Sequence, residues 1–224
     1  MVAPFPKANV DIFPLLCSFP HITTLFGGTF SEEVTIYCKE HQITTYDLRS
    51  FPELTAYNAI ATAEGALALA MTLQPTNLSE GHCLVTGFGY CGKQIATMLR
   101  GLGAKVSVAV RNPALASTIA QMGFTYLSLE ELDSYLCNCE YIFNTIPAVI
   151  FTKERLELLP REALLIDIAS APGGVDYDSA RFLERKAHLC PALPGRFSPK
   201  SSGIKLAKLI LQQLTTTSNY QEVL

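Results

Sequence analysis

Three glycines, Gly87, Gly89 and Gly92, limit the possible folds of this chain more than any other segment. They directly follow the apolar residues 83–86 and precede a helical pattern over 90–102. In such a strand–turn–helix unit the first glycine permits a tight turn, the second lets a pyrophosphate approach the backbone, and the third lets helix and strand pack closely. Free N–H groups at the helix start would face the phosphates. The segment therefore predicts a dinucleotide-binding unit, and the alternative is a glycine-rich turn without a ligand.

From residue 81 onward, short apolar runs alternate with helical patterns. The predicted strands cover 82–87, 105–110, 125–127, 141–145, 163–169 and 188–193. The predicted helices cover 90–102, 113–122, 152–158, 177–187 and 201–214, and one more follows a capping box at 128–131. Alternation of this kind implies parallel strands joined by right-handed crossovers. We therefore expect the α/β class, with a doubly wound parallel-sheet Rossmann domain over 76–214 and a frayed tail over 215–224.

Residues 1–75 predict fewer elements. We expect an irregular arm over 4–20, strands over 21–26 and 43–48, and a helix over about 32–41 that Ser31 caps. A nearly all-apolar helix over 62–73 is expected to lie between layers and to connect two domains. Two strands and one helix are few for an independent domain. The segment 1–75 is therefore interpreted as an incomplete, substrate-side α/β domain.

The end of the second strand of the dinucleotide unit bears on the choice of coenzyme. An NAD enzyme usually places an acid there to bind the ribose hydroxyls. This chain instead has Arg111 and Asn112. A guanidinium suits a 2′-phosphate by charge and geometry, so NADP is favoured over NAD. The alternative is a solvated surface arginine.

Polar residues also end two later strands, at the edge where open α/β sheets bind ligands. Asn144, Thr145 and Ile146 precede Pro147 and are expected to contact the nicotinamide ribose, although an ordinary strand-to-helix turn stays open. Asp167 lies within an apolar strand, and a buried carboxylate needs hydrogen-bond donors. We expect it to organise the loop 170–174 rather than to react. The residues expected to bind the coenzyme are Gly87, Phe88, Gly89, Tyr90, Cys91, Gly92, Arg111, Asn112, Asn144, Thr145 and Ile146.

Two cations and two hydroxyls lie near the start of the last predicted helix: Arg196, Lys200, Ser201 and Ser202. A cation at the positive end of a helix is unfavourable unless an anion offsets it. The segment therefore favours a ligand with a carboxylate over a solvated loop. The four histidines are scattered and form no dyad with a nucleophile or an acid.

Composition excludes several classes of protein. A net charge of −3 argues against a nucleic-acid partner, because phosphate binding needs excess Lys and Arg. No run of 18 apolar residues predicts a membrane span, and residues 1–7 lack the pattern of a signal peptide. Seven cysteines without metal-ligand spacing indicate free thiols and no metal site. A reducing, cytoplasmic location is expected.

The order of these motifs resembles the family of dipicolinate synthase A subunits. The matching segments are 57–65, 87–92, 144–147, 166–176, 193–195 and 199–200. The segment 166–176 and the Leu-Pro-Gly…Pro-Lys pattern over 193–200 are more specific than the glycine motif. This chain departs from the family pattern at Ala61, which replaces a proline, at Ala192, which replaces a glycine, and at Ser201-Ser202, which replace Thr-Ala. The resemblance also suggests a chain that is shortened at its N-terminus.

The resemblance implies a 2-hydroxyacid-dehydrogenase-like architecture and NAD(P)-dependent oxidation of dihydrodipicolinate to dipicolinate during sporulation. It implies a partner, the B subunit of dipicolinate synthase, and leaves a homo-oligomer open. Lys200, with the N–H groups of Ser201 and Ser202, would bind one substrate carboxylate, and Arg196 is a weaker candidate for the other. Glu64 would accept the proton, unless it is a capped or paired acid between domains.

Three alternatives stay open. One is a dehydrogenase of another small carboxylic acid, which ordinarily needs a histidine base supported by an acid. Another is a non-catalytic dinucleotide-binding module, and the third is a structural relative that binds no coenzyme.

Overall fold

The computed structural model describes residues 1–2, 11–19 and 21–221, and it divides the chain into two compact units. One unit combines Met1–Tyr57 with Lys200–Leu224, and the other comprises Asn58–Pro199. The boundaries differ from the expected 75 and 214. They differ because residues 63–70 pack against the main sheet, whereas Leu209 near the C-terminus packs with Phe26, Leu48 and Leu54.

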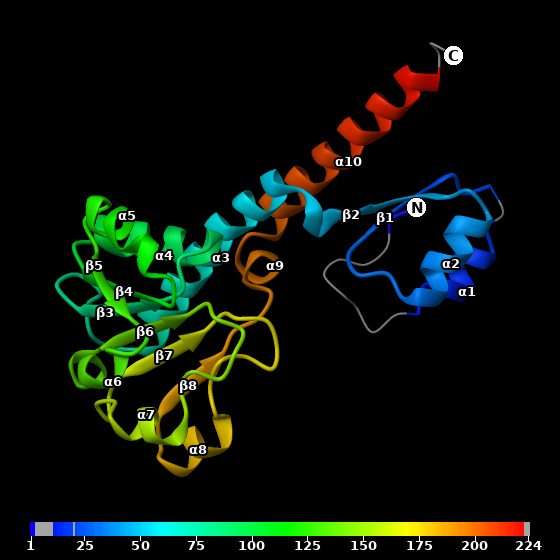
Figure 1. The fold of residues 1–224 in the computed structure, drawn as a ribbon. Coiled ribbons are helices and arrows are strands. Elements are labelled where there is room, and N and C mark those ends of the chain that lie inside the picture. The colour runs from blue at the N-terminus through cyan, green and yellow to red at the C-terminus, as the bar shows by residue number, and fades with distance from the viewer. Residues whose placement is uncertain (3–10, 20, 222–224) are drawn as a thin grey trace. The chain divides into compact units, whose positions relative to one another are not determined.

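The larger unit contains a six-stranded, all-parallel sheet with the order β5-β4-β3-β6-β7-β8 (Figure 1). The strands are β3 (His82–Thr86), β4 (Lys105–Val110), β5 (Thr125–Ser128), β6 (Tyr141–Asn144), β7 (Leu164–Asp167) and β8 (Lys186–Leu189). This is the strand order of the dinucleotide-binding fold, in which the chain direction along the sheet reverses between β3 and β6. The expected doubly wound α/β class is confirmed.

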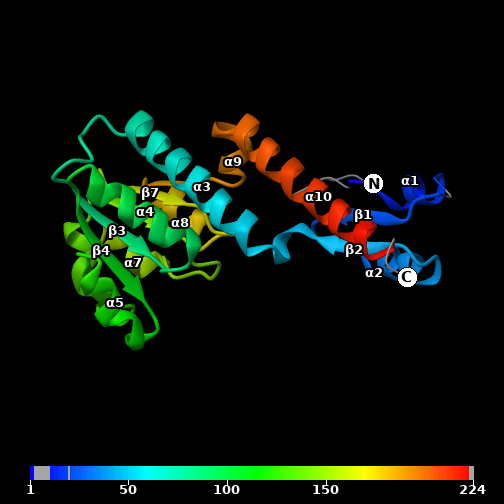
Figure 2. The ribbon, with the colours of Figure 1, turned by 90° about the horizontal axis from the view of Figure 1, so that it is seen from above.

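Both faces of this sheet are covered by helices. They are α3 (Pro52–Leu73), α4 (Tyr90–Gly101), α5 (Ala116–Gln121), α6 (Leu132–Tyr135), α7 (Lys153–Glu157), α8 (Tyr177–Phe182) and α9 (Leu193–Phe197). Short 3-10 turns cover Pro113–Leu115 and Leu136–Asn138. Cys83 and Val85 of β3 pack toward α3, α4 and α5, and Leu84 packs toward α6, α7 and α8. Figure 2 shows α3 and α4 side by side on the first face. Strands buried on both faces explain why they are apolar almost throughout.

Several boundaries differ from the predicted ones for local reasons. Helix α3 begins at Pro52, ten residues before the predicted start, because proline suits the first turn of a helix. Helix α8 ends at Phe182, since Glu184 adopts a left-handed φ of +53°, and β8 then begins at Lys186. Ala192, also left-handed, precedes the unpredicted α9.

The smaller unit contains α1 (Phe13–Cys17), β1 (Thr24–Gly27), α2 (Glu32–Glu40), β2 (Thr44–Asp47), a 3-10 turn over Leu48–Ser50 and α10 (Pro199–Gln221). β1 and β2 pair in parallel. The hydroxyl of Ser31 accepts a hydrogen bond from the N–H of Val34 at 3.3 Å, which confirms the predicted cap.

Two expectations for the ends of the chain are corrected in this unit. Residues 13–17 are helical within the predicted irregular arm, whereas 3–10 and 20 lie outside the described residues. Residues 215–221 continue α10 rather than fray, and 222–224 lie outside the described range. Within the described ranges, no helix has the length and apolar character that a membrane span requires.

Candidate dinucleotide-binding site

The three motif glycines meet different surroundings at the end of β3. Gly87 has φ +91°, and a Cβ there would lie 2.3 Å from Oγ1 of Thr145. A Cβ on Gly92 would lie 2.2 Å from the carbonyl oxygen of Gly87, so α4 packs directly against the turn. A Cβ on Gly89 would meet no atom within 4 Å. The protein itself needs Gly87 and Gly92, whereas Gly89 leaves an open cradle in front of the helix.

The start of α4 is suited to an anion. Gly89 occupies the N-cap position and offers no side-chain acceptor to the first-turn N–H groups. These N–H groups have no partner inside a helix, and they mark the positive end of the helix dipole. The first turn carries no acid, and the ammonium group of Lys93 lies 5.3 Å from the ring of Phe88. The cradle therefore fits a pyrophosphate.

The three non-glycine residues of the motif differ in exposure. Phe88 is only 7% exposed and meets Phe124 edge to face at 6.2 Å, so a ligand could reach only its backbone. The side chain of Tyr90 is 53% exposed. Cys91 is half-buried, and burial raises the pKa of its thiol while a hydrogen bond to Thr62 opposes this shift. The structure thus leaves Tyr90 as the motif side chain most open to a ligand.

Arg111 and Asn112 lie just beyond β4, the strand next to the cradle. The N–H of Gly87 donates to the carbonyl of Ala109 at 2.9 Å, which joins the cradle to the end of β4. Oδ1 of Asn112 accepts from the N–H of Ala114 at 3.0 Å, so this side chain caps the following turn. Arg111 is exposed and forms no hydrogen bond or ion pair within the described part of the chain. Its charge is therefore available to a ligand or to solvent.

Asn144, Thr145 and Ile146 follow β6, on the other side of β3. Asn144 is fully buried and hydrogen-bonds to protein groups, whereas direct contact with a ribose was expected. The hydroxyl of Thr145 donates to the carbonyl of Thr86 at 2.7 Å. Thr145 and Ile146 are half-buried at the edge of the cradle.

Asp167 ends β7 and is fully buried. Its carboxylate accepts hydrogen bonds from the N–H groups of Ala169 at 3.1 Å and Gly174 at 2.7 Å. The prediction that Asp167 organises the loop 170–174 is confirmed. Sequence reasoning missed two of its neighbours, Thr86 and Tyr177. A polar residue ending the apolar β3 was the available signal for Thr86, whereas nothing local indicated Tyr177.

The predicted substrate residues are divided between the units. Arg196 lies in α9 of the larger unit, is exposed, and its guanidinium lies 5.7 Å from the ring of Phe197. Lys200, Ser201 and Ser202 form the first turn of α10 and belong to the smaller unit. Lys200 is exposed, whereas Oγ of Ser202 is buried and has no hydrogen-bond partner among the described residues. That these residues act together stays a prediction.

Glu64, the predicted proton acceptor, is exposed on α3. It forms no hydrogen bond or ion pair in the portion of the chain that the structure describes. In the same portion, no group of three His, Cys, Asp or Glu residues could hold a metal ion. The structure leaves the role of Glu64 as a prediction.

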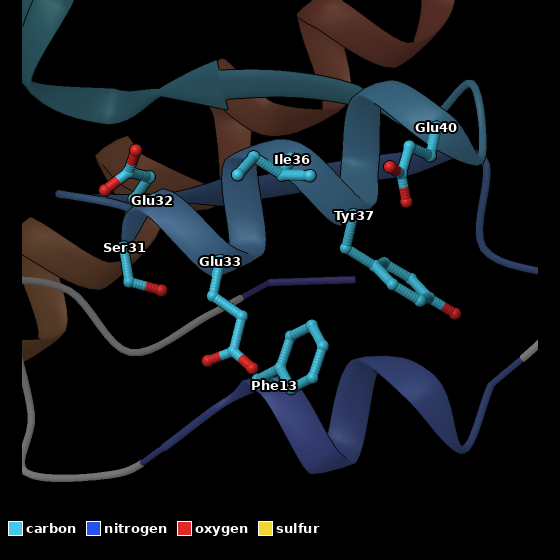
Figure 3. A pocket seen from close by; sticks show the side chains of 7 residues that line it. All are labelled: Phe13, Ser31, Glu32, Glu33, Ile36, Tyr37 and Glu40. Carbon is cyan, nitrogen blue, oxygen red and sulfur yellow. The ribbon is translucent and has the colours of Figure 1, made fainter.

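A separate surface hollow of about 580 Å³ lies in the smaller unit, between α1 and α2 (Figure 3). It is lined by Phe13, Ser31, Glu32, Glu33, Ile36, Tyr37 and Glu40. Figure 3 shows Glu33 beside Phe13, and Glu32 and Glu40 at opposite ends of α2. Three carboxylates would repel a phosphate or a dicarboxylate. The cradle at Gly89 is therefore the better candidate for an anionic coenzyme.

Comparisons with known proteins agree with this geometry. Residues 54–185 match the NAD binding domain of D-isomer specific 2-hydroxyacid dehydrogenases. The dipicolinate synthase A subunit of Bacillus subtilis is 33% identical over 162 residues, which are 72% of this chain and 54% of that protein. The chain thus spans about half the length of this curated relative.

Two crystal structures are similar along most of the chain. The dipicolinate synthase A chain from Bacillus subtilis gives a TM-score of 0.83 at 29% identity, covering 88% of this chain and 66% of that one. The corresponding protein from Bacillus halodurans gives a TM-score of 0.80 at 31% identity, covering 85% of this chain and 66% of that one. The resemblance predicted from the motifs is confirmed.

Proposed function

Because the chain belongs to the family of D-isomer specific 2-hydroxyacid dehydrogenase NAD-binding domains, we propose that it binds NADP, or NAD less tightly, as an oxidoreductase. The open cradle at Gly89, before a helix start without acids, carries this proposal. The exposed Arg111 at the end of β4 would bind the 2′-phosphate of NADP.

The proposed reaction is the oxidation of dihydrodipicolinate to dipicolinate in sporulation, and similarity to the dipicolinate synthase A chains supports it. When bound, the nicotinamide ring would accept the hydride that the dihydropyridine ring loses. Glu64 would take the accompanying proton. Since the product ring is aromatic, the protein has mainly to hold substrate and coenzyme in contact, with reacting atoms about 3–3.5 Å apart.

The proposed substrate site uses the start of α10. Lys200 at the positive end of this long helix is unfavourable without an anion nearby. The buried hydroxyl of Ser202 also lacks a hydrogen-bond partner among the described residues. Both observations support one carboxylate on Lys200 and the N–H groups of Ser201 and Ser202, with Arg196 as a candidate for the second carboxylate.

The relatives are named as one component of a synthase with more than one kind of chain, which supports its B subunit, in turn, as the partner of this chain. A second candidate function is coenzyme binding without turnover. It is favoured because the glycine cradle, Arg111 and the 144–146 segment all lie in one compact unit. A homo-oligomer stays open.

The test is a titration of the chain with NADPH and NADH, followed by turnover of freshly made dihydrodipicolinate with and without the B subunit of dipicolinate synthase. We expect NADPH to bind more tightly than NADH and turnover to reduce NADP. Lys200→Ala should lower turnover more than about tenfold while NADPH binding is unchanged. Absence of coenzyme binding would refute the proposal, and binding without turnover, even when that partner is present, would favour the non-catalytic module. Unchanged turnover in Lys200→Ala would remove Lys200 from the site.

A further inference from the structure

Asp167 and Asn144 form a fully buried pair at the ends of β7 and β6. Oδ1 of Asp167 accepts from Nδ2 of Asn144 at 2.8 Å and from the N–H of Ala169 at 3.1 Å. Oδ2 accepts from the N–H of Gly174 at 2.7 Å and from the hydroxyl of Tyr177 at 2.8 Å. A buried carboxylate is costly unless donors surround it, and these four donors meet that need.

The carboxylate fixes the direction of every hydrogen bond beyond it. An ionised Asp167 only accepts, so the amide of Asn144 must point its Nδ2 toward Asp167. Oδ1 of Asn144 then accepts from the hydroxyl of Thr86 at 2.6 Å and from the N–H of Ile146 at 3.1 Å. The ends of β7, β6 and β3 are thereby joined by one directed chain of side-chain hydrogen bonds.

This chain of hydrogen bonds reaches the glycine cradle on one side. Thr86 directly precedes Gly87, and its carbonyl accepts from the hydroxyl of Thr145 at 2.7 Å. Oγ1 of Thr145 lies only 2.3 Å from the position of a Cβ on Gly87. A displacement of Asn144 would therefore be passed to Gly87 through Thr86 and Thr145.

The same amide contacts the loop after β7 on its other side. A Cβ on Gly174 would lie 2.3 Å from Nδ2 of Asn144 and 2.7 Å from the carbonyl oxygen of Ile146. The carbonyl of Gly174 also accepts from the N–H groups of Ile150 and Phe151 at 3.0 Å. The loops after β6 and β7 thus form one connected edge beside the cradle.

We propose that Asp167 and Asn144 are positioning residues for coenzyme binding: they hold the glycine cradle and the loop 168–174 in one arrangement. The proposal rests on the proposed coenzyme function. Neither side chain touches the coenzyme in this scheme, because both are fully buried. Their effect is exerted through Thr86, Thr145 and Gly174.

The first experiment reverses the pair. Asn144→Asp places two carboxylates together, Asp167→Asn removes the acceptor, and the double exchange restores one amide opposite one carboxylate. Each single variant should bind NADPH at least about tenfold more weakly, because a buried hydrogen bond to a charged group is lost. The double variant should bind about threefold or more tighter than either single variant, because the two sites are coupled. Equal or weaker binding by the double variant would overturn the proposal.

A milder pair of variants guards against misfolding of the first set. Thr86→Val removes the hydroxyl that Asn144 binds, whereas Thr86→Ser keeps it. NADPH binding should be about tenfold weaker in the first and close to that of the original chain in the second. Ser107→Ala is the stability control, since it removes a hydrogen bond between Ser107 and Tyr135 of 2.6 Å in the middle of β4. Comparable loss of NADPH affinity in Ser107→Ala would assign the effect to general destabilisation and overturn the proposal.

Hydrogen exchange of the coenzyme-free chain separates this inference from the proposed function. Faster exchange of the N–H groups of Ile146 and Gly174 is expected in Thr86→Val but not in Thr86→Ser. If the original chain binds no NADPH, the proposed function fails and the positioning role fails with it. If the chain binds NADPH but Thr86→Val changes neither exchange nor affinity, only the positioning role is refuted.

Discussion

Substitution of Gly89 by alanine separates coenzyme binding from folding. Gly89 has φ −76° and ψ −162°, an extended conformation that alanine adopts without strain. The added Cβ would meet no atom within 4 Å, so no clash opposes it in the free protein. The free energy of unfolding should be unchanged or rise by about 0.4–1 kcal/mol, since the unfolded chain loses conformational freedom.

The same methyl group occupies the space through which a pyrophosphate would approach the first turn of α4. Displacing a phosphate from even one N–H group costs a hydrogen bond to a charged group, about 1.5–3 kcal/mol. NADPH should therefore bind about ten- to hundredfold more weakly to Gly89→Ala. Fluorescence titration with NADPH measures the affinity, and a denaturant melt measures the stability.

Two matched variants make the result interpretable. Gly101→Ala, at the end of the same helix, also meets no atom within 4 Å and should leave NADPH affinity unchanged. Gly92→Ala would place a Cβ 2.2 Å from the carbonyl oxygen of Gly87, so both stability and binding should fall, stability by about 1–3 kcal/mol. The reasoning is refuted if Gly89→Ala binds NADPH as tightly as the original chain, or if it unfolds as readily as Gly92→Ala.

Three further outcomes are expected. Arg111→Ala should weaken NADPH about tenfold and leave NADH affinity unchanged, and equal losses for both coenzymes would exclude a 2′-phosphate contact. Glu64→Gln should lower turnover of dihydrodipicolinate about a hundredfold with NADPH binding intact, and full turnover would remove Glu64 as the proton acceptor. Burial raises the pKa of Cys83 and of Cys139 to about 12. Mass spectrometry after iodoacetamide at pH 8 should therefore find exposed Cys137 modified before these two, and early modification of Cys83 would contradict its burial. Since unfolded thiols ionise near pH 9 and the buried ones do not, the free energy of unfolding should fall as pH rises from 9 toward 12.

Sequence reasoning predicted best the elements whose ends carry local signals. The glycines after β3 and the flanking residues of β4 place both strands nearly as observed. The capping box is also confirmed: the N–H of Ser128 donates to Glu131 at 2.9 Å, and the N–H of Glu131 donates to the hydroxyl of Ser128 at 3.2 Å. Such signals depend on residues three or four apart, so one sequence is enough to interpret them.

Other features depend on contacts that the sequence does not reveal locally. Glu184 and Ala192 are non-glycine residues with positive φ, and the ends of α8 and the start of α9 follow from them. The hydrogen bond between Asn144 and Asp167 joins residues 23 positions apart. Its existence follows from the pairing of β6 with β7, which places Asn144 opposite Asp167. The sequence predicted a polar edge there but not which side chains it buries.

The structure also weighs the two interpretations of the glycine motif. A ligand-free turn accounts for Gly87 and Gly92, since added side chains at both would collide with protein atoms. It does not account for Gly89, where the described residues leave room for a side chain. Ser, Asp or Asn at this N-cap would satisfy first-turn N–H groups and stabilise the helix by about 1 kcal/mol relative to an uncapped end. Glycine forgoes that cap and leaves the N–H groups free, and a rule of local stability broken without a structural gain indicates a functional site.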